Sequence, residues 1–293
     1  MAKIVCFGEV LWDVFSTHKK IGGAPLNVAI RQKSFNNQVT MISAVGNDDL
    51  GKRILDFINQ KGIDTKFIQV LEDFSTGEVT VALDKKGGAT YQIVHPKAWD
   101  KIEFTEAAAE IVKQADAFVF GSLIGRDEVS KNTLYQFLEV AKYAIFDVNL
   151  RAPFYTKELL IDFMNKANFI KFNDDELYEI SEYLGSEFKN LEQNIHFISE
   201  KTNTKHICVT KGEHGAVLLY NNQLFYNSGY KIKVIDTVGA GDSFLGTLTS
   251  KLLNGYLPQE AIDYACAIGA LVAQKEGANP EISQLEIKKF MNI

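Results

Sequence analysis

Residues 236–244 read Asp236-Thr237-Val238-Gly239-Ala240-Gly241-Asp242-Ser243-Phe244. The segment follows a strand-like run, Lys231–Ile235, and precedes the apolar spacing of a long helix, Phe244 to Leu252. The two glycines let backbone N–H groups turn toward a ligand, and the free N–H groups of a first helical turn bind anions with help from the helix dipole. We therefore expect a phosphate site here. Taken alone, the segment is explained equally well by an ordinary helix start, where the dipole favours Asp242.

A second glycine-rich element comes close after the first predicted strand. It reads Gly22-Gly23-Ala24-Pro25-Leu26-Asn27-Val28-Ala29. Its glycines allow close approach of the backbone, Pro25 suits a first helical turn, and Asn27 offers a donor and an acceptor to a hydroxylated ligand. Taken alone, a helix start with a partly buried Asn27 is the simpler interpretation. Two such elements in one chain make the functional interpretation more specific.

Short, nearly continuous apolar runs alternate with helical segments along the chain. The helical spacing is clear at Leu50–Ile58 and Leu134–Ala141. The apolar runs are typical of strands buried on both faces, and the alternation predicts an α/β fold with a mostly parallel sheet between two layers of helices. Because no linker or shift in composition divides the chain, we expect one domain over residues 1–293. The runs are Lys3–Glu9, Thr40–Gly46, Ala117–Leu123, Ala144–Asn149, Phe169–Asn173 and His206–Lys211.

One segment departs from this alternation. Apolar and polar residues alternate over Thr76–Asp84, a turn is predicted at Lys85-Lys86-Gly87-Gly88, and a second strand at Thr90–Val94. We interpret this hairpin, joined by Asp13–Thr17, as a flap over a cleft. The expected small antiparallel β lid comprises residues of about 13–20 and 76–98.

Composition and charge exclude several classes of protein. The chain has 293 residues, 46% of them hydrophobic and 23% charged, with 5 prolines, which excludes disordered and collagen-like chains. The formal charge is −6, from 31 Lys+Arg and 37 Asp+Glu, and no basic cluster predicts a nucleic-acid partner. No apolar run has the length of a membrane helix, and we expect no signal peptide. The cysteines, Cys6, Cys208 and Cys266, are predicted to be buried free thiols, so we expect a cytoplasmic location.

The two glycine-rich elements together resemble the PfkB, or ribokinase-like, family of carbohydrate kinases. That family carries an N-terminal Gly-Gly-x-x-x-Asn and a C-terminal Asp-Thr-x-Gly-Ala-Gly-Asp-x-Phe, both of which occur here unchanged. The resemblance spans nearly the whole chain, with Phe104–Leu138 the least distinctive part. It implies a ribokinase-like fold, a sheet between helices with a small β lid, and an ATP-dependent sugar kinase.

Further family elements follow in the expected order. Asn173-Asp174-Asp175-Glu176 matches an Asn-x-x-Glu element associated with magnesium and phosphate, although Asn173 and Glu176 could simply form a capping box. The run Val209–Gly215 matches a strand and turn beside the nucleotide, which implies ATP contacts from Thr210, Lys211, Gly212 and Gly215, or a plain hairpin turn. Asp13 matches the family's sugar-binding aspartate, or is a solvated turn residue.

Two more residues enter the predicted site. The run Asp147-Val148-Asn149-Leu150-Arg151 resembles one common in fructokinase-like members, so Arg151 is a candidate for a phosphate or substrate contact through its guanidinium, or a surface arginine. Trp99, just past the hairpin, either stacks on the apolar face of a sugar or anchors the hairpin to the body. With Asp13, Gly22, Gly23, Asn27 and Asp242, it completes the predicted substrate-binding set.

The resemblance implies a division of roles in phosphoryl transfer, where positioning and charge stabilisation dominate. Asp242 accepts the proton of the sugar hydroxyl, while the amides of Gly239, Ala240, Gly241 and Asp242 hold the negative charge of the transferring group. With an ordinary carboxyl pKa near 4 the base is weak, so proton transfer should be late.

The resemblance also implies cations. Mg²⁺ would be held through water by Asn173 and Glu176. A monovalent cation, K⁺, would be held near the anion site by backbone carbonyls of Asp236, Val238 and Gly277.

The opening Gly-Glu-Val-Leu-Trp-Asp-Val-Phe looks most like fructokinases, which makes fructose the expected sugar. Ribokinase, 2-keto-3-deoxygluconate kinase, nucleoside kinase and tagatose-6-phosphate kinase share the framework and stay open, as does a non-catalytic sugar-binding or nucleotide-binding relative, which the retained Asp242 disfavours. A Rossmann dehydrogenase and a P-loop NTPase are disfavoured because neither glycine fingerprint occurs. Lids of this family sometimes pair between subunits, so a homodimer through the lid and a monomer are both open.

Overall fold

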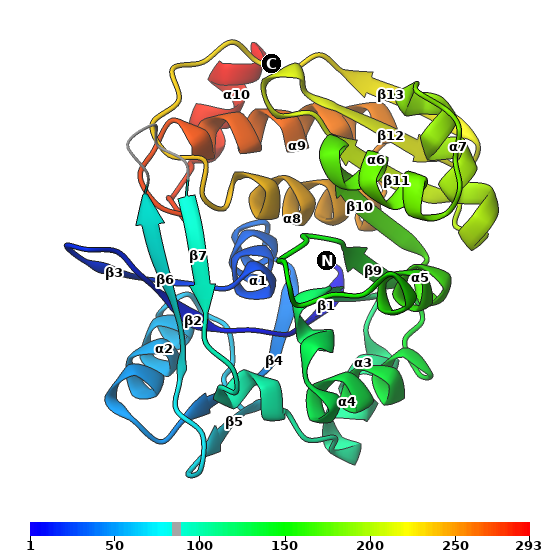
Figure 1. Ribbon diagram of the computed structural model, residues 1–293. Helices are drawn as coiled ribbons and strands as arrows, with labels where there is room; N and C mark the ends of the chain where they lie inside the picture. The colour runs from blue at the N-terminus through cyan, green and yellow to red at the C-terminus, as the bar shows by residue number, and fades with distance from the viewer. Residues whose placement is uncertain (84–88) are drawn as a thin grey trace.

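The computed structural model describes residues 1–83 and 89–293, and Figure 1 shows a large twisted sheet between helices with a smaller sheet beside it. Within these residues the large sheet has nine strands in the order β13-β12-β11-β10-β9-β8-β1-β4-β5. The pairings from β11 to β5 are parallel, and β12 and β13 add an antiparallel hairpin at one edge. The strands are β1 (Lys3–Phe7), β4 (Gln38–Gly46), β5 (Ile68–Leu71), β8 (Ala117–Gly121), β9 (Ala144–Asp147), β10 (Phe169–Asn173), β11 (His206–Thr210), β12 (Ala216–Tyr220) and β13 (Gln223–Asn227).

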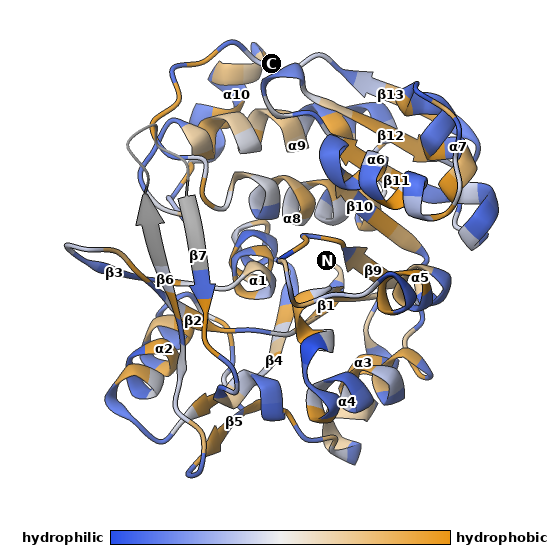
Figure 2. Cartoon of the chain, viewed as in Figure 1, coloured by the Kyte–Doolittle hydropathy of each residue, from blue (hydrophilic) through white to orange (hydrophobic). Residues whose placement is uncertain are grey.

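The central strands are apolar on both faces, and each face is covered by helices. Every residue of β8 is buried, and in Figure 2 the strands are orange between helices whose outer sides are blue. Phe120 of β8 stacks on Phe146 of β9 with ring centres 5.1 Å apart, which belongs to the core on one face. That face is covered by α3 (Glu106–Gln114), α4 (Glu128–Leu138), α5 (Lys157–Lys166), α6 (Asp174–Tyr183) and α7 (Leu191–Thr202). The other is covered by α1 (Ala24–Ser34), α2 (Asp49–Gln60), α8 (Ala240–Leu253) and α9 (Pro258–Ala273), with α10 (Gln284–Met291) packed on α9. The predicted α/β class, with helices on both faces of a mostly parallel sheet, is confirmed.

The smaller sheet has the strand order β3-β2-β6-β7. Its strands are β2 (Leu11–Val14), β3 (Lys19–Gly22), β6 (Gly77–Leu83) and β7 (Ala89–Ile93). Both hairpins are antiparallel, whereas β2 and β6 pair in parallel where the two hairpins join. The predicted hairpin and its partner segment are therefore found together, with strands at 11–22 and 77–93 in place of 13–20 and 76–98. Residues 84–88, which include the predicted turn, lie outside the described residues.

The segment before α8 differs from the prediction. Lys231–Ile235 was expected to be a strand, but it has no regular secondary structure, and Val234 and Ile235 are 55% and 59% exposed. The N–H groups of Ile235 and Asp236 donate to the carbonyl of Ala273 at the end of α9, so they are unavailable to a sheet. These two hydrogen bonds hold the segment before α8 against the end of α9. In the part of the chain that the structure describes, no helix combines the length and the apolar character needed to cross a membrane.

Candidate active site

The two glycine-rich elements meet beside the carboxyl ends of the central strands. Asn27 lies in the first turn of α1 and Asp242 in the first turn of α8, 215 residues apart in sequence. The Asn27 amide Nδ2 donates to Asp242 Oδ2 at 2.7 Å. The side chain of Asp242 therefore points toward α1, and the two helix starts share one site.

The start of α8 is built as a cradle for an anion. Gly239 caps the helix with φ 74°, and a Cβ at this position would lie 2.5 Å from Ala278, so only glycine fits. Ala240 N–H donates to the carbonyl of Thr237 at 3.2 Å. Within residues 1–83 and 89–293, the N–H groups of Gly241 and Asp242 have no hydrogen-bond acceptor. Of the four predicted amide donors, Ala240 is thus already engaged, and free N–H groups at a helix start suit phosphate oxygens.

Asp13 faces the same site from the smaller sheet. A Cβ on Gly22 would lie 2.4 Å from Asp13 Oδ2, so the carboxylate packs directly on the glycine backbone. Burial raises the pKa of Asp13 to about 6, the negative charge of Asp242 adds to this, and the positive charges of Arg151 and Lys20 oppose it. Asp13 and Asp242 are therefore close enough to sense each other's charge. Gly23, with φ 113°, caps α1.

Asp242 itself has a perturbed carboxyl group. Burial raises its pKa to about 6, and the charge of Asp147 adds to the effect, while the Asn27 hydrogen bond and the charges of Lys171 and Arg151 oppose it. The expectation of an ordinary pKa near 4 for this group is therefore wrong, because the carboxyl group is partly buried and lies beside Asp147. A carboxylate with a pKa about 2 units higher is a stronger base toward a hydroxyl group.

Glu9, which follows β1, is a third carboxyl group at the site. It is 4% exposed; its Oε1 accepts from Ala24 N–H at 3.3 Å, and its Oε2 has no partner among the described residues. Burial raises the pKa of Glu9 to about 7, against hydrogen bonds from backbone N–H groups and the charge of Arg151. The Arg151 guanidinium, whose Nη1 donates to the carbonyl of Leu150, lowers the pKa of Glu9, Asp13 and Asp242 alike. Arg151 thus stands within electrostatic reach of all three acidic groups.

A buried ion pair lies beside the start of α8. Lys171 Nζ, in β10, donates to Asp147 Oδ1, at the end of β9, at 3.1 Å. A Cβ on Gly241 would lie 3.7 Å from the same Nζ, which puts the ammonium next to the anion cradle. Burial lowers the pKa of Lys171, but the charges of Asp147, Glu176 and Asp242 together raise it above its ordinary value, so the amine stays protonated.

At the start of α6, Asn173 and Glu176 form a capping box, which was the alternative to a metal site in the sequence analysis. Asn173 Oδ1 accepts from Glu176 N–H and Glu176 Oε2 accepts from Asn173 N–H, both at 2.8 Å. Glu176 Oε1 accepts from Leu150 N–H at 2.9 Å. Both carboxylate oxygens are therefore engaged, which fits contact with a metal through water better than direct ligation.

The predicted nucleotide and monovalent-cation residues lie in two loops. Thr210 pairs with Asn173 across β11 and β10, and the turn after it, with Gly212, is closed by Lys211 N–H donating to Gly215 O at 2.7 Å. In the other loop, Asp236 accepts from Val238 N–H at 3.0 Å and from Gly277 N–H at 2.9 Å. The Asp236 side chain thus joins all three residues predicted for a monovalent cation.

Comparisons with known proteins agree with this geometry. The sequence model of the pfkB family of carbohydrate kinases matches residues 1–285. The chain belongs to this family. Probable fructokinase-3 of Arabidopsis thaliana is 28% identical over 320 residues, covering 98% of this chain and 91% of the relative. Fructokinase of Solanum tuberosum is 28% identical over 305 residues, covering 95% and 92%.

Solved structures of the family share the fold. A double mutant of fructokinase from Vibrio cholerae O395, in a form with fructose, ADP and potassium ion bound, has a TM-score of 0.86 at 22% identity and covers 99% of this chain and 98% of that one. A putative ribokinase II from E. coli has a TM-score of 0.85 at 22% identity, covering 100% and 99%. The chain is thus an ATP-dependent carbohydrate kinase with the ribokinase-like fold.

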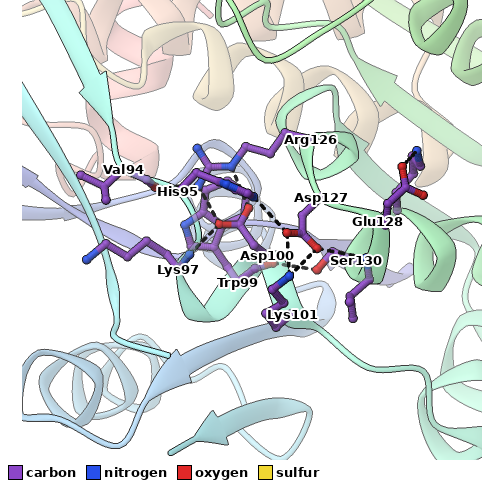
Figure 3. Close-up of polar contacts among 12 residues, drawn as sticks. Val94, His95, Lys97, Trp99, Asp100, Lys101, Arg126, Asp127, Glu128 and Ser130 are labelled. Carbon is purple, nitrogen blue, oxygen red and sulfur yellow. Dashed lines mark hydrogen bonds and ion pairs between the residues drawn. The ribbon is translucent and has the colours of Figure 1, made fainter. Parts of the chain in front are cut away.

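The structure corrects one predicted role within this PfkB-family site. Trp99, in the turn η1 (Ala98–Lys101), is 1% exposed, and the Arg126 guanidinium lies 3.9 Å from the centre of its ring (Figure 3). Arg126 also donates to both oxygens of Asp100 at 2.7 Å and to the carbonyl of Val94 at 2.9 Å. Trp99 therefore has no free face for a sugar and anchors the hairpin to the body, which was the structural alternative.

Asn27 makes two hydrogen bonds within the protein. Its Nδ2 donates to Asp242 and its Oδ1 accepts from Asn279 Nδ2 at 2.7 Å, so one N–H and one lone pair of the amide are left for a ligand. The sequence interpretation missed Lys171, Glu9 and Asn279 as site residues. Lys171 left a signal, since a lysine within an apolar strand needs a charged partner.

Proposed function

We propose that this chain is a fructokinase that transfers the γ-phosphoryl group of ATP to a hydroxyl of fructose. The observation that carries the proposal is the 2.7 Å contact of Asn27 with Asp242, because it brings the start of α1, next to Gly22 and the Asp13 carboxylate, to the free N–H groups at the start of α8. A sugar hydroxyl and a phosphoryl group could therefore meet at one carboxylate. Curated relatives named as fructokinases over nearly the whole length support fructose as the sugar.

In the proposed reaction, Asp242 orients the attacking hydroxyl and accepts its proton. With a pKa of about 6 it is mostly ionised at neutral pH, so it is ready to act as a base. Asp13, in β2 of the smaller sheet, accepts hydrogen bonds from other sugar hydroxyls, since an ionised carboxylate is an acceptor only. The reaction should lose rate below about pH 6, where Asp242 becomes protonated.

Charge on the transferring group is held from the other side of the site. The start of α8 offers the free N–H groups of Gly241 and Asp242, and the ammonium of Lys171 lies next to them. Such preorganised donors stabilise charge that develops in the transition state. Arg151 supplies a second cation within reach of the same carboxylates. We assign contacts with the nucleotide to Thr210–Gly215.

Metal ions fit this site in a supporting role. No group of three or more His, Cys, Asp or Glu side chains suitable for a metal occurs in residues 1–83 and 89–293. We assign Mg²⁺ a site reached together with ATP, where it would touch the protein through water at Asn173 and Glu176; when bound, it would neutralise charge on the triphosphate. The Asp236 side chain holds Val238 and Gly277 together through their N–H groups, and we assign K⁺ to the backbone carbonyls of these three residues.

The smaller sheet acts as a lid in this proposal. It carries Asp13, and Lys20 of β3 lies 3.7 Å from Asp236 Oδ2, so the sheet already contacts the loop before α8. Closing it over a bound sugar would keep water from the phosphoryl group. We propose that residues 1–293 form one domain that includes this lid. A homodimer that pairs through the lid is one possible assembly of this domain.

The test is ADP release from ATP and Mg²⁺ across a panel of fructose, ribose, adenosine, 2-keto-3-deoxygluconate and tagatose 6-phosphate. We expect kcat/KM to be highest for fructose. A higher kcat/KM for another acceptor would show that fructose is not the preferred substrate, while the assignment as a kinase would stand. No ADP release with any acceptor, at sugar concentrations that calorimetry shows to be bound, would favour a non-catalytic binding protein.

A further inference from the structure

Asp242 is held through a chain of two amide side chains that begins in the C-terminal turn of the protein. Asn279 Nδ2 donates to Asn27 Oδ1 at 2.7 Å, and Asn27 Nδ2 donates to Asp242 Oδ2 at 2.7 Å. Neither the sequence interpretation nor the proposed roles above give Asn279 a function.

The orientation of each amide in this chain is fixed by the carboxylate at its end. An ionised carboxylate only accepts hydrogen bonds, so Asn27 must turn its NH₂ group toward Asp242 and its oxygen away. That oxygen in turn requires a donor, so Asn279 must present its own NH₂ group. The consequence is visible at Asn279, whose Oδ1 is buried and has no donor among the described residues. A buried acceptor without a partner is rare, which indicates that the orientation of Asn279 serves Asn27.

The turn that carries Asn279 is fastened to the two helices that it serves. Gly277 N–H donates to Asp236 Oδ2 at 2.9 Å, before α8. Arg31, one helical turn after Asn27 in α1, donates from Nη2 to Pro280 O and from Nε to Ser243 Oγ, both at 3.3 Å. The turn, α1 and the start of α8 are thereby held in one arrangement.

We propose that Asn279 is a positioning residue for the catalytic base, which through Asn27 fixes Oδ2 of Asp242 and leaves Oδ1 for the sugar hydroxyl. This inference rests on the proposed role of Asp242 as the base. When Asn279 cannot donate, the Asn27 amide is free to rotate and present its oxygen to Asp242. Two facing oxygens repel unless Asp242 carries a proton, so the ionised, active form of the base becomes less populated.

Asp242 also senses charged groups from every side, and these stay the same in the variants below. They are Glu9 after β1, Asp13 in β2, Asp147 in β9, Arg151 after β9 and Lys171 in β10. A change in the pH dependence on altering the uncharged Asn279 therefore reports on the hydrogen-bond chain.

The experiment compares Asn279→Leu, which keeps the shape of the side chain and removes the donor, with wild type in fructose-dependent ADP release from pH 5 to 9. We expect kcat to fall by roughly 3–10-fold, the acid limb of kcat/KM to move up by about half a unit to one unit, and the KM for ATP to stay unchanged. Asn279→Ala serves as the second variant if the leucine variant does not fold. A drop in kcat together with the shifted acid limb supports the proposal. Wild-type kcat and an unmoved acid limb overturn it, as does a change confined to KM.

A matched control lies at the opposite end of α8. Asn254 Nδ2 also donates to an asparagine, Asn37 Oδ1, at 3.1 Å, far from the site. Asn254→Leu should leave the pH profile of kcat/KM unchanged, and an equal shift in this variant would mean that the effect is only structural. Asp242→Asn, measured in parallel, separates the two hypotheses. If it keeps near wild-type turnover, the proposed base is wrong; if it loses turnover while Asn279→Leu does not, only the positioning role is wrong.

Discussion

Replacing Lys171 with methionine removes the cation beside the anion cradle and keeps most of the side-chain volume. The Lys171 and Asp147 side chains are 8% and 5% exposed and their charged atoms are 3.1 Å apart. Breaking a buried ion pair by removing one partner costs about 3–5 kcal/mol, because the other charge stays buried without compensation. Loss of one donor to the transferring group lowers kcat by roughly 10²–10³-fold. We therefore expect Lys171→Met to lose both stability and turnover.

The double variant Lys171→Met, Asp147→Leu distinguishes these two effects. Replacing both charges with apolar side chains is often neutral for stability, so the midpoint of urea unfolding should return to within about 1 kcal/mol of wild type. Turnover with ATP and fructose should remain low, because the cation is still missing. Lys275→Met is the control: its partner Glu286 is 44% exposed, and we expect a change below about 1 kcal/mol and wild-type turnover. If the double variant regained wild-type turnover, Lys171 would be structural and the reasoning would be refuted.

The remaining predictions concern charge burial, the anchor of the hairpin and the metal. Burial raises the pKa of Glu9 to about 7 from an ordinary 4.5, so the folded protein binds a proton that the unfolded chain releases, and stability falls as the pH rises from 4.5 to 7. Glu9→Gln should therefore raise the free energy of unfolding by about 2–3 kcal/mol at pH 8 and leave it unchanged at pH 4. An equal gain at both pH values would show that burial of the charge is not the cause. Arg126→Met leaves Asp100 buried without its partner and should lower stability by about 3–5 kcal/mol in urea unfolding; a change below about 1 kcal/mol would show that the anchor is not needed. Chelating Mg²⁺ with EDTA should abolish ADP release and leave fructose binding in calorimetry intact, whereas full activity in EDTA would remove the metal from the proposal.

The parallel core of the fold could be predicted from the sequence because its strands are buried on both faces. Phe169–Asn173 and Ala117–Leu123 are each dominated by buried apolar residues, as a central strand requires. Lys231–Ile235 has similar residues, yet its N–H groups bond to Ala273 at the end of a helix, a contact that no local pattern reveals. The edge strand β13 was missed because its partly exposed residues carry a weaker apolar signal. Its neighbour β12 was also missed, although Ala216–Leu219 is a buried apolar run that could have been recognised.

The site divides in the same way between local and long-range information. The sequence could predict Gly239, Gly241 and Asp242, because a few consecutive residues are enough to indicate a helix start with free N–H groups. Trp99 could not be assigned from sequence, because its two possible roles differ only in whether Arg126 covers the ring. Asn279 has no local signal at all: its importance arises from one hydrogen bond to a residue 252 positions away.

The base assignment is tested most directly with Asp242→Asn, which keeps the size of the side chain and removes its charge. With ATP, Mg²⁺ and fructose, we expect kcat to fall by roughly 10²–10⁴-fold, while the Kd for ATP, measured by calorimetry, changes by less than about 3-fold. Near wild-type turnover in this variant would contradict the claim that Asp242 accepts the proton of the sugar hydroxyl.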